Sequence, residues 1–340
     1  MSVAGRFAPS PTGQLHLGNL RTAVVAWCTA RASGLEFLVR VEDLLRIPQS
    51  DAIEETQLAD LAVLGITSDL AVVRQSERSH LYEAALATLA ERGITYECYC
   101  TRREIAAEIA ASVSAPHGRS LGRTSDHYPG TCARLSERER RQRQREGRPA
   151  ALRVTGTTSE ISGTDLVAGT FSATVDDFVV RRGDGIAAYN LAVVIDDAAQ
   201  GVTQVVRGND LLESTPRQMF LQSLLGLPTP AYAHVPLVVG SDGERLAKRH
   251  AGTDGGVTLR ELQSAGRYLG DVMAGLLMST GWVGPSMIPV EIVEEIRATR
   301  GQVDLGTLAE VLRDKCGEPG QNLTLNWGVT PKSPIYRDTL

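Results

Sequence analysis

The chain has 340 residues, of which 42% are hydrophobic and 22% are charged, a usage that excludes a disordered or fibrous chain. Its formal charge of −5 neither predicts nor excludes a nucleic-acid partner, because a local basic face can lie on an acidic protein. No apolar run approaches the roughly 18 residues of a membrane span, and the first residues lack the pattern of an export signal. We therefore expect a soluble, cytoplasmic protein of about two domains, without a membrane partner.

Strand and helix patterns alternate in the first 95 residues. Strands are predicted at residues 3–8 and 36–41, and helices begin at Asn19, at Ser50 as a cap and near Leu81. A glycine stands at the end of each helical pattern, as is typical of a C-terminal cap. This alternation favours a parallel sheet with helices on its faces.

The pattern changes near residue 96. Residues 101–104 (Thr-Arg-Arg-Glu) fit a capping box and predict a helix to about Ala111. Residues 112–130 are rich in Ser, Gly, Pro and His and predict a long loop. Residues 134–148 hold seven arginines and three glutamates; we interpret them as an exposed, solvated helix, with a nucleic-acid contact as the alternative.

Alternation returns in the second half of the chain. Buried strands are predicted at residues 187–195 and 202–206, and a helix at 216–225. Residues 259–278 have a helical, amphipathic pattern apart from their glycines, and a last helix is predicted at 305–314.

Three of the five cysteines cluster in the sequence, at Cys98, Cys100 and Cys132. Without an export signal this clustering favours a metal site over disulfides, and three thiolates suit a closed, structural zinc site. By residue type alone, His127 or His117 is the expected fourth ligand. Cys28 lies on an apolar helix face and is expected in the core, whereas Cys316 has no visible partner.

Two motifs carry the chemistry of phosphate binding. Residues 6–13 (Arg-Phe-Ala-Pro-Ser-Pro-Thr-Gly) precede His16-Leu17-Gly18-Asn19, and a strand end, loop and helix start together form an anion site. His16 adds a donor, and Gly18 lets a flat ring approach the backbone. Downstream, residues 245–249 (Arg-Leu-Ala-Lys-Arg) form a basic loop, in which Lys248 can stabilise charge on a triphosphate. Taken alone, the first motif also fits an ordinary helix start, and the second also fits a solvated turn.

In this order and separation, the two motifs resemble the signature motifs of class I aminoacyl-tRNA synthetases. Asn19 stands where the family has a second histidine, and Arg245, Ala247 and Arg249 replace Lys, Ser and Ser. Six blocks in the family's order resemble its glutamyl branch. They are the first motif, Arg40-Val41-Glu42-Asp43, Tyr189-Asn190-Leu191-Ala192, Val194-Ile195-Asp196-Asp197, Val206-Arg207-Gly208 and Thr215-Pro216-Arg217-Gln218. The resemblance covers residues 3–280.

The resemblance implies an α/β fold. It consists of a Rossmann-type doubly wound parallel sheet, an inserted zinc-bearing α+β subdomain and a short helical C-terminal extension. The implied boundaries are 1–95 and 186–255 for the two halves of the catalytic domain, 96–185 for the insert, 256–300 for a helical stem-like region and 301–340 for a tail without an assigned role.

The length of the chain separates two families of that branch. About 90 residues follow Arg249, whereas a full glutamyl-tRNA synthetase carries a large anticodon-binding region there. The chain is therefore more similar to the shorter glutamyl-Q tRNA(Asp) synthetase family. That resemblance implies tRNA-independent activation of L-glutamate with ATP and Mg²⁺, and transfer of the glutamate to queuosine at the wobble position of tRNA(Asp). A compact enzyme that charges a tRNA 3′ end and a non-catalytic tRNA- or amino-acid-binding relative are the alternatives. A monomer is the starting expectation.

The resemblance also implies roles for individual residues. Arg6 and Tyr189 would bind the side-chain carboxylate of glutamate, Glu42 the ammonium group, and Ser10 and Arg207 the remaining carboxylate. An arginine suits this choice because a carboxylate pairs with it through two oxygens, whereas an amide cannot. The implied catalytic residues are His16, Gly18, Asn19 and Lys248. The implied ATP contacts are His16, Gly18, Arg245, Leu246 and Lys248. The implied zinc ligands are Cys98, Cys100, Tyr128 and Cys132, with His127 as a rival to Tyr128.

Overall fold

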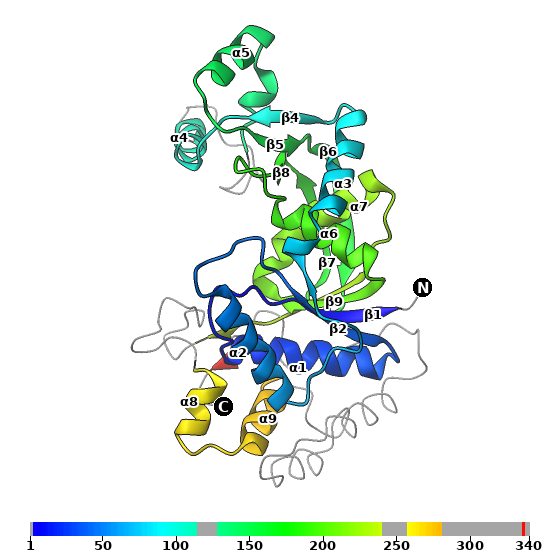
Figure 1. Ribbon diagram of the computed structural model, residues 1–340. Helices are drawn as coiled ribbons and strands as arrows, with labels where there is room; N and C mark the ends of the chain where they lie inside the picture. The colour runs from blue at the N-terminus through cyan, green and yellow to red at the C-terminus, as the bar shows by residue number, and fades with distance from the viewer. Residues whose placement is uncertain (1–2, 114–127, 240–256, 281–334, 337–340) are drawn as a thin grey trace.

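The computed structural model describes residues 3–113, 128–239, 257–280 and 335–336 of the chain (Figure 1). Within them, a seven-stranded sheet forms the centre of an α/β fold. Its strands in spatial order are β3 (Val73–Arg74), β2 (Glu36–Val41), β1 (Ala4–Phe7), β9 (Val202–Gly208), β10 (Ala231–Val235), β6 (Thr157–Asp165) and β7 (Gly169–Val175). All neighbours pair in parallel except β6 and β7. The predicted α/β class with a mainly parallel sheet is confirmed.

The middle strand β1 brings the first motif to the edge of the sheet. All four of its residues are buried, as expected for a parallel strand covered on both faces. Gly5 is required there, because a Cβ at this position would lie 2.7 Å from the Cβ of Ala30 on helix α1 (Leu17–Ala32). Helix α1 therefore packs closely on β1 and shares one core with helix α9 (Leu269–Met278).

A second core lies among three helices and strand β8 (Phe178–Arg181). The helices are α3 (Ser79–Glu91), α6 (Tyr189–Ala199) and α7 (Thr215–Leu225). The strand predicted at residues 187–195 is wrong, because this segment forms α6. Helix α6 contacts α3, α7, β8 and β9, so Leu191 to Val194 are all buried. A short, continuous apolar run of this kind does not distinguish a strand from a buried helix.

A smaller antiparallel sheet lies at the end of the molecule far from α9 (Figure 1). It consists of β4 (Thr95–Cys98), β5 (Ala151–Val154) and β8, and it is accompanied by α4 (Arg102–Val113) and α5 (Glu137–Arg145). The β6–β7 hairpin belongs to the same stretch of sequence but joins the large sheet, where Asp165 pairs with Tyr232. The domain boundaries themselves stay a prediction.

The other helices and strands that the structure describes are mostly short and lie outside the two sheets. They are α2 (Ser50–Val63), α8 (Leu259–Ser264), the 3₁₀ turns Gln75–Glu77, Cys132–Arg134 and Asn209–Ser214, and the strand pair β11 (Val238–Val239) and β12 (Ile335–Tyr336).

Several predicted helix boundaries are corrected by the structure. Helix α1 begins at Leu17, before Asn19, and Ser50 is the first residue of α2 instead of its cap. The helical pattern at 259–278 divides into α8 and α9, which are separated at Gly266, where φ is +76°. The capping box at residues 101–104 is confirmed. The predicted helix at 305–314 and most of the predicted loop at 112–130 lie outside the described residues.

Among the described residues, none of the helices combines the length and the apolar character that crossing a bilayer requires.

Candidate active site and metal centre

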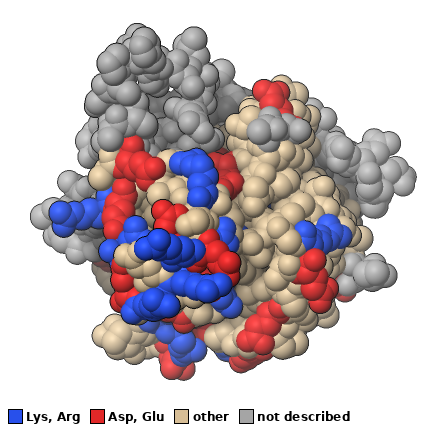
Figure 2. All heavy atoms as spheres, turned by 90° about the horizontal axis from the view of Figure 1, so that it is seen from above, with Lys and Arg blue, Asp and Glu red and all other residues tan. Residues whose placement is uncertain are grey.

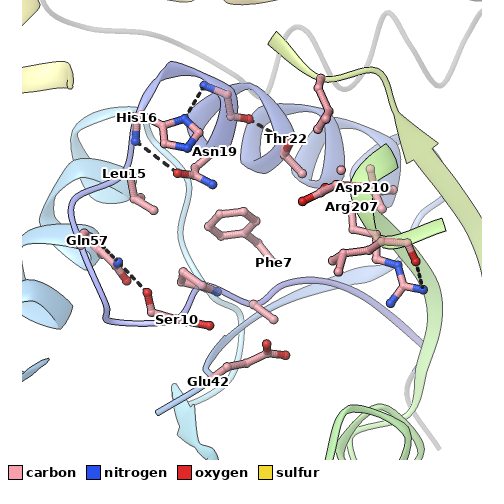
Figure 3. Close-up of a pocket in the computed structure, with 18 of the residues that line it drawn as sticks. Phe7, Ser10, Leu15, His16, Asn19, Thr22, Glu42, Gln57, Arg207 and Asp210 are labelled. Carbon is pink, nitrogen blue, oxygen red and sulfur yellow. Dashed lines mark hydrogen bonds between the residues drawn. The ribbon is translucent and has the colours of Figure 1, made fainter. Parts of the chain in front are cut away.

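A cavity of about 390 Å³ lies where β1 and β9 end and α1 begins (Figure 3). It brings together eight of the residues that the sequence singled out: Arg6, Ser10, His16, Gly18, Asn19, Glu42, Tyr189 and Arg207. Lys248, Arg245 and Leu246 fall outside the described residues. Ligands in sheets of this kind bind beyond the carboxyl ends of the strands, so the cavity is the candidate active site.

The first turn of α1 is held by side chains from the motif itself. Nδ1 of His16 accepts a hydrogen bond from the Gly18 N–H over 3.1 Å, and Oδ1 of Asn19 accepts one from the His16 N–H over 3.2 Å. Because Nδ1 is an acceptor, the proton of the neutral imidazole is on Nε2. A Cβ at Gly18 would lie 3.1 Å from the His16 ring. His16 is thus the N-cap residue of α1, and the side chain of Asn19 completes a capping box with it.

Arg6 lies in the wall of the cavity but is already paired. Its Nε lies 3.3 Å from Oδ1 of Asp197, and the same oxygen accepts a hydrogen bond from Nη1 of Arg40 over 2.7 Å. Arg40 also contacts Glu42, with Nη2 3.3 Å from Oε1. Its Nε also lies 3.9 Å from Oδ2 of Asp196, so arginines and carboxylates form a buried group of ion pairs at the wall of the pocket.

The charges of this buried group are set by competing effects. Burial alone would raise the pKa of Asp197, but Arg6 and Arg40 lower it below its ordinary value. For Glu42, burial raises the pKa, and the attraction of Arg40 only partly opposes the rise. Asp197 and Arg40 were not predicted as site residues, although both lie in sequence blocks that carried the resemblance.

A chain of buried polar residues holds the guanidinium of Arg207 in position. Its Nε donates to Nε2 of His234 over 2.9 Å, and its Nη groups donate to Gln218 and Thr215 over 2.8 and 2.9 Å. Nδ1 of His234 lies 2.6 Å from Oδ2 of Asp165. Burial and the neighbouring Arg207 lower the pKa of His234, so the ring is neutral, donates from Nδ1 to Asp165 and accepts at Nε2.

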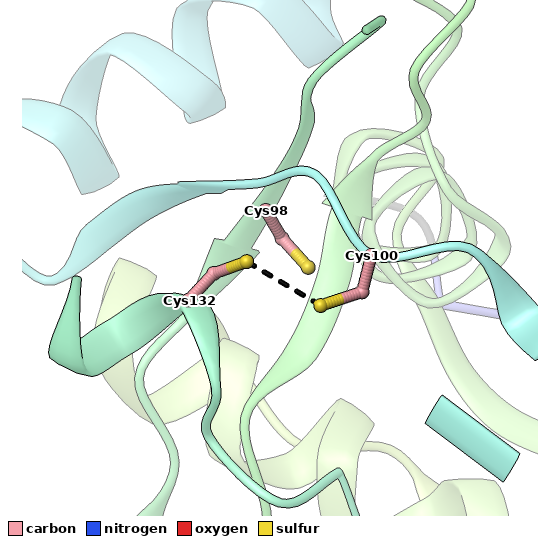
Figure 4. A group of neighbouring side chains, drawn as sticks. All are labelled: Cys98, Cys100 and Cys132. Carbon is pink, nitrogen blue, oxygen red and sulfur yellow. Dashed lines mark hydrogen bonds between the residues drawn. The ribbon is translucent and has the colours of Figure 1, made fainter. Parts of the chain in front are cut away.

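The cysteine cluster forms in the small sheet (Figure 4). The Sγ atoms of Cys98, Cys100 and Cys132 all lie within 4.8 Å of one another. The Tyr128 hydroxyl lies 3.4 Å from Cys98 Sγ and 3.6 Å from Cys100 Sγ. The hydrogen bond between Cys98 and Cys100 lowers the pKa of the Cys98 thiol and raises the pKa of the Cys100 thiol.

These donors fit a structural zinc ion. Three sulfur ligands with one oxygen make a four-coordinate set without an open position, and clustered thiolates favour zinc. The two histidines weighed as the fourth ligand, His127 and His117, lie outside the described residues, as does Cys316. Cys28 is fully buried in α1, which confirms its place in the core.

Helix α5 contains no buried residue, as its charge pattern predicts, and only Arg140 and Arg143 on it are partly covered. Ser136 caps it, and Arg141 and Arg143 pair with Glu137 and Glu146 on its surface. Seen from that end of the molecule, arginines and acidic residues are interspersed (Figure 2). The helix is thus a solvated face in the structure, and a nucleic-acid contact stays an untested alternative.

A mainly parallel sheet with a cavity beyond the carboxyl ends of its strands, at the start of a helix, is an arrangement typical of nucleotide-dependent enzymes. Residues 2–282 match the family described as tRNA synthetases class I (E and Q), catalytic domain, and the chain belongs to this family.

Two relatives show how far the similarity extends. The chain is 54% identical over 297 residues to the glutamyl-Q tRNA(Asp) synthetase of Nocardia farcinica, which covers 87% of this chain and 90% of the relative. It is 46% identical over 292 residues to the enzyme of that name from Symbiobacterium thermophilum. This match covers 83% of this chain and 87% of the relative.

Solved structures of larger enzymes share the fold. A glutamate tRNA ligase from Elizabethkingia meningosepticum, in complex with its amino acid, matches 83% of this chain with a TM-score of 0.67 and 27% identity. A glutamate-tRNA synthetase from Elizabethkingia anophelis matches 90% with a TM-score of 0.70 and 26% identity. The chain spans 61% and 66% of these two proteins, less than two thirds of each.

Proposed function

We propose that the protein activates L-glutamate with ATP and transfers it to queuosine at the wobble position of tRNA(Asp). The observation that carries this proposal is the extent of the similarity. Relatives named glutamyl-Q tRNA(Asp) synthetase are matched over 90% and 87% of their length, whereas the two glutamate-charging synthetases are matched over 61% and 66%.

In the first step, the pocket would bind glutamate by its charges. Arg6 and Tyr189 bind the side-chain carboxylate, and Glu42 accepts from the ammonium group. Ser10 and Arg207 bind the α-carboxylate and turn it toward ATP. The buried ion pairs of Arg6, Arg40, Asp197 and Glu42 support this role, because they hold Arg6 rigidly, and a rigid donor distinguishes a carboxylate from an amide.

The start of α1 would bind the phosphates of ATP. The positive end of the helix dipole attracts an anion, and His16, the N-cap residue, lies at this end of α1. An oxygen of the glutamate α-carboxylate attacks the α-phosphorus, the bond to the β-phosphate breaks, and pyrophosphate leaves with Mg²⁺. Lys248 would stabilise the charge that develops in this step. Glutamyl-adenylate is the product.

In the second step, a hydroxyl of queuosine attacks the carbonyl carbon of glutamyl-adenylate, and AMP leaves. A zinc ion held by Cys98, Cys100, Cys132 and Tyr128 would have a structural role. It would join β4 to the turn at Cys132–Arg134 and to Tyr128, and it would take no part in either step.

Glutamate-dependent exchange of pyrophosphate into ATP, measured without tRNA, tests the activation step. We expect exchange with L-glutamate and at least tenfold less with L-glutamine. Exchange that begins only when tRNA(Glu) is added would indicate a charging enzyme instead. No exchange with or without tRNA would indicate a non-catalytic relative, and either result would contradict the proposal.

A further inference from the structure

A second cavity of about 340 Å³ lies between the small sheet and the start of α6. Tyr189 lines this cavity and also the candidate active site, so the two spaces adjoin at one side chain. The polar part of its wall consists of Tyr128, Arg153, Asp176, Asp177, Asn190 and Arg217. Its volume is in the range of small-molecule sites.

Both carboxylates in the wall are held in place. Oδ1 of Asp176 accepts from Nε and Nη2 of Arg217 over 3.0 and 2.7 Å, and its Oδ2 accepts from the Tyr128 N–H over 2.9 Å. Asp177 accepts from the hydroxyl of Tyr96 over 2.5 Å and from the Gly156 N–H over 2.8 Å. Carboxylates fixed in this way are preorganised acceptors for hydroxyl or ammonium groups of a ligand.

A buried donor also lines the cavity. Arg153 is 8% exposed, and its guanidinium lies 3.7 Å from the centre of the Tyr128 ring. Its Nη1 donates to the carbonyl oxygen of Asp177 over 2.8 Å, whereas its Nε has no hydrogen-bond partner among the described residues. Arg153 therefore adds a buried guanidinium to the wall of the cavity.

Hydrogen bonds connect this wall to the glutamate pocket. Arg207 donates to Oε1 of Gln218 over 2.8 Å, and Nε2 of Gln218 donates to Oδ1 of Asn190 over 3.1 Å. Asn190 lines the second cavity. Arg207, which is proposed to orient the α-carboxylate, is therefore connected by hydrogen bonds to the wall of the second cavity.

We propose that the second cavity is the acceptor site, which binds the nucleoside that receives glutamate. This inference rests on the proposed function. The acceptor must bring a hydroxyl to the glutamyl carbonyl, which Arg207 would orient. The hydrogen bonds from Arg207 through Gln218 to Asn190 connect that end of the glutamate pocket to the second cavity. A nucleoside with a vicinal diol and a secondary ammonium group, as in queuosine, matches a wall that offers fixed carboxylates together with arginine and amide groups.

The transfer step needs no reactant other than the acceptor and glutamyl-adenylate. The acceptor hydroxyl oxygen bonds to the carbonyl carbon, the bond from that carbon to the AMP phosphate breaks, and the hydroxyl proton leaves with the phosphate. The cavity binds and orients the acceptor, and the products are a glutamyl ester of the nucleoside and AMP.

A variant that fills the cavity tests the proposal directly. Val179 lies in the wall on β8, half-buried and without charge. In Val179→Phe, we expect the rate of glutamate transfer to queuosine-bearing tRNA(Asp) to fall at least tenfold more than the rate of pyrophosphate exchange. Val63→Phe is the matched control, because Val63 is exposed at the end of α2, outside the residues that line either cavity; it should preserve the ratio of the two rates.

A second variant removes a charge instead of adding volume. Arg217→Gln should lower the ratio of transfer to exchange in the same direction. Arg31→Gln breaks a similar half-buried pair with Asp69 and should leave the ratio unchanged. Free queuosine nucleoside should inhibit transfer by the natural protein, and this inhibition should weaken in Val179→Phe.

Each outcome distinguishes this inference from the proposed function. If the natural protein transfers no glutamate to queuosine-bearing tRNA(Asp), the proposed function fails. If the natural protein transfers glutamate and both cavity variants keep the ratio, the acceptor site is elsewhere and only the further inference fails. The inference is also overturned if exchange falls as much as transfer in both variants, since the cavity would then serve activation or folding.

Discussion

Arg207 owes its position to His234, a residue that does not line the pocket. The neutral ring accepts from Arg207 at Nε2 and is oriented by Asp165 at Nδ1. In His234→Asn the amide can still reach Asp165 but offers no acceptor at the Nε2 position, whereas Gln can place one there. We expect His234→Asn to raise the KM for glutamate in pyrophosphate exchange about tenfold, from the 1–3 kcal/mol cost of an unpaired donor.

His234→Gln should restore most of this loss, because the glutamine oxygen replaces the lost acceptor. Equal KM values in both variants and the natural protein would contradict a role of His234 in positioning Arg207. Thermal unfolding of the two variants is the control, since a purely structural role would lower both melting temperatures and leave KM unchanged.

The same histidine predicts how stability depends on pH. Burial and Arg207 lower the pKa of His234 below the 6.5 of the unfolded chain, so below that pH the unfolded state binds more protons than the folded state. The contribution of His234 to the free energy of unfolding is therefore lost as the pH falls from about 6.5 toward the lowered pKa. Denaturant unfolding across this window should show the loss, and His234→Gln should lack it. Parallel profiles for the two proteins would contradict the prediction.

Arg6 is the most direct test of glutamate recognition. Asp197 keeps its 2.7 Å contact with Arg40 when Arg6 is removed, so Arg6→Ala should fold. Loss of one partner of a buried charge pair costs about 2–5 kcal/mol, and we expect activation of glutamate to fall a hundredfold or more. The measurement is glutamate-dependent pyrophosphate exchange, with circular dichroism as the check on folding. Normal exchange kinetics would remove Arg6 from the substrate site.

Among the elements, the small sheet carries the cysteine cluster. Cys98 ends β4, and Cys132 begins a turn 34 residues further on. We expect Cys98→Ser to lower zinc content and melting temperature more than ATP affinity, because the cluster lies apart from the phosphate site. Cys28→Ser is the matched control, since that thiol is buried in α1 and should affect stability without affecting zinc. Equal zinc in Cys98→Ser and the natural protein, by elemental analysis, would remove the metal site.

Elements with strong local signals could be predicted from the sequence, whereas those decided by tertiary contacts could not. The strand at Glu36–Val41 and the capped helices α3 and α4 follow from periodicity and capping residues. The apolar run in α6 predicts a strand, although the segment is a helix. Because α3, α7 and the sheet bury α6, its sequence lacks the polar face by which an amphipathic helix is recognised.

The same contrast holds for the site. Motif residues such as His16 and Arg207 were found because they belong to recognisable sequence blocks. Asp165 and Asp197 were not, because each acts through another residue and reaches it across 69 or 191 positions of sequence. No local pattern records such a contact.

At the scale of the whole molecule, the candidate active site, the second cavity and the cysteine cluster are neighbours. Tyr189 borders both the candidate active site and the second cavity, and Tyr128 borders the second cavity and the cysteine cluster. We therefore expect removal of the proposed zinc ion with a chelator to lower the transfer of glutamate more than its activation. Transfer and exchange rates measured on the same chelated sample check this. An equal fall in both would show that the cluster supports the fold as a whole and not the acceptor side.

The reaction itself is tested most directly by transfer of labelled glutamate. Queuosine-bearing tRNA(Asp), the same tRNA without queuosine, and tRNA(Glu) would be compared, with the position of the label mapped after nuclease digestion. We expect label only on queuosine-bearing tRNA(Asp), at the wobble nucleoside. Label on the 3′ end of tRNA(Glu) would instead identify a compact charging enzyme and contradict the proposed function.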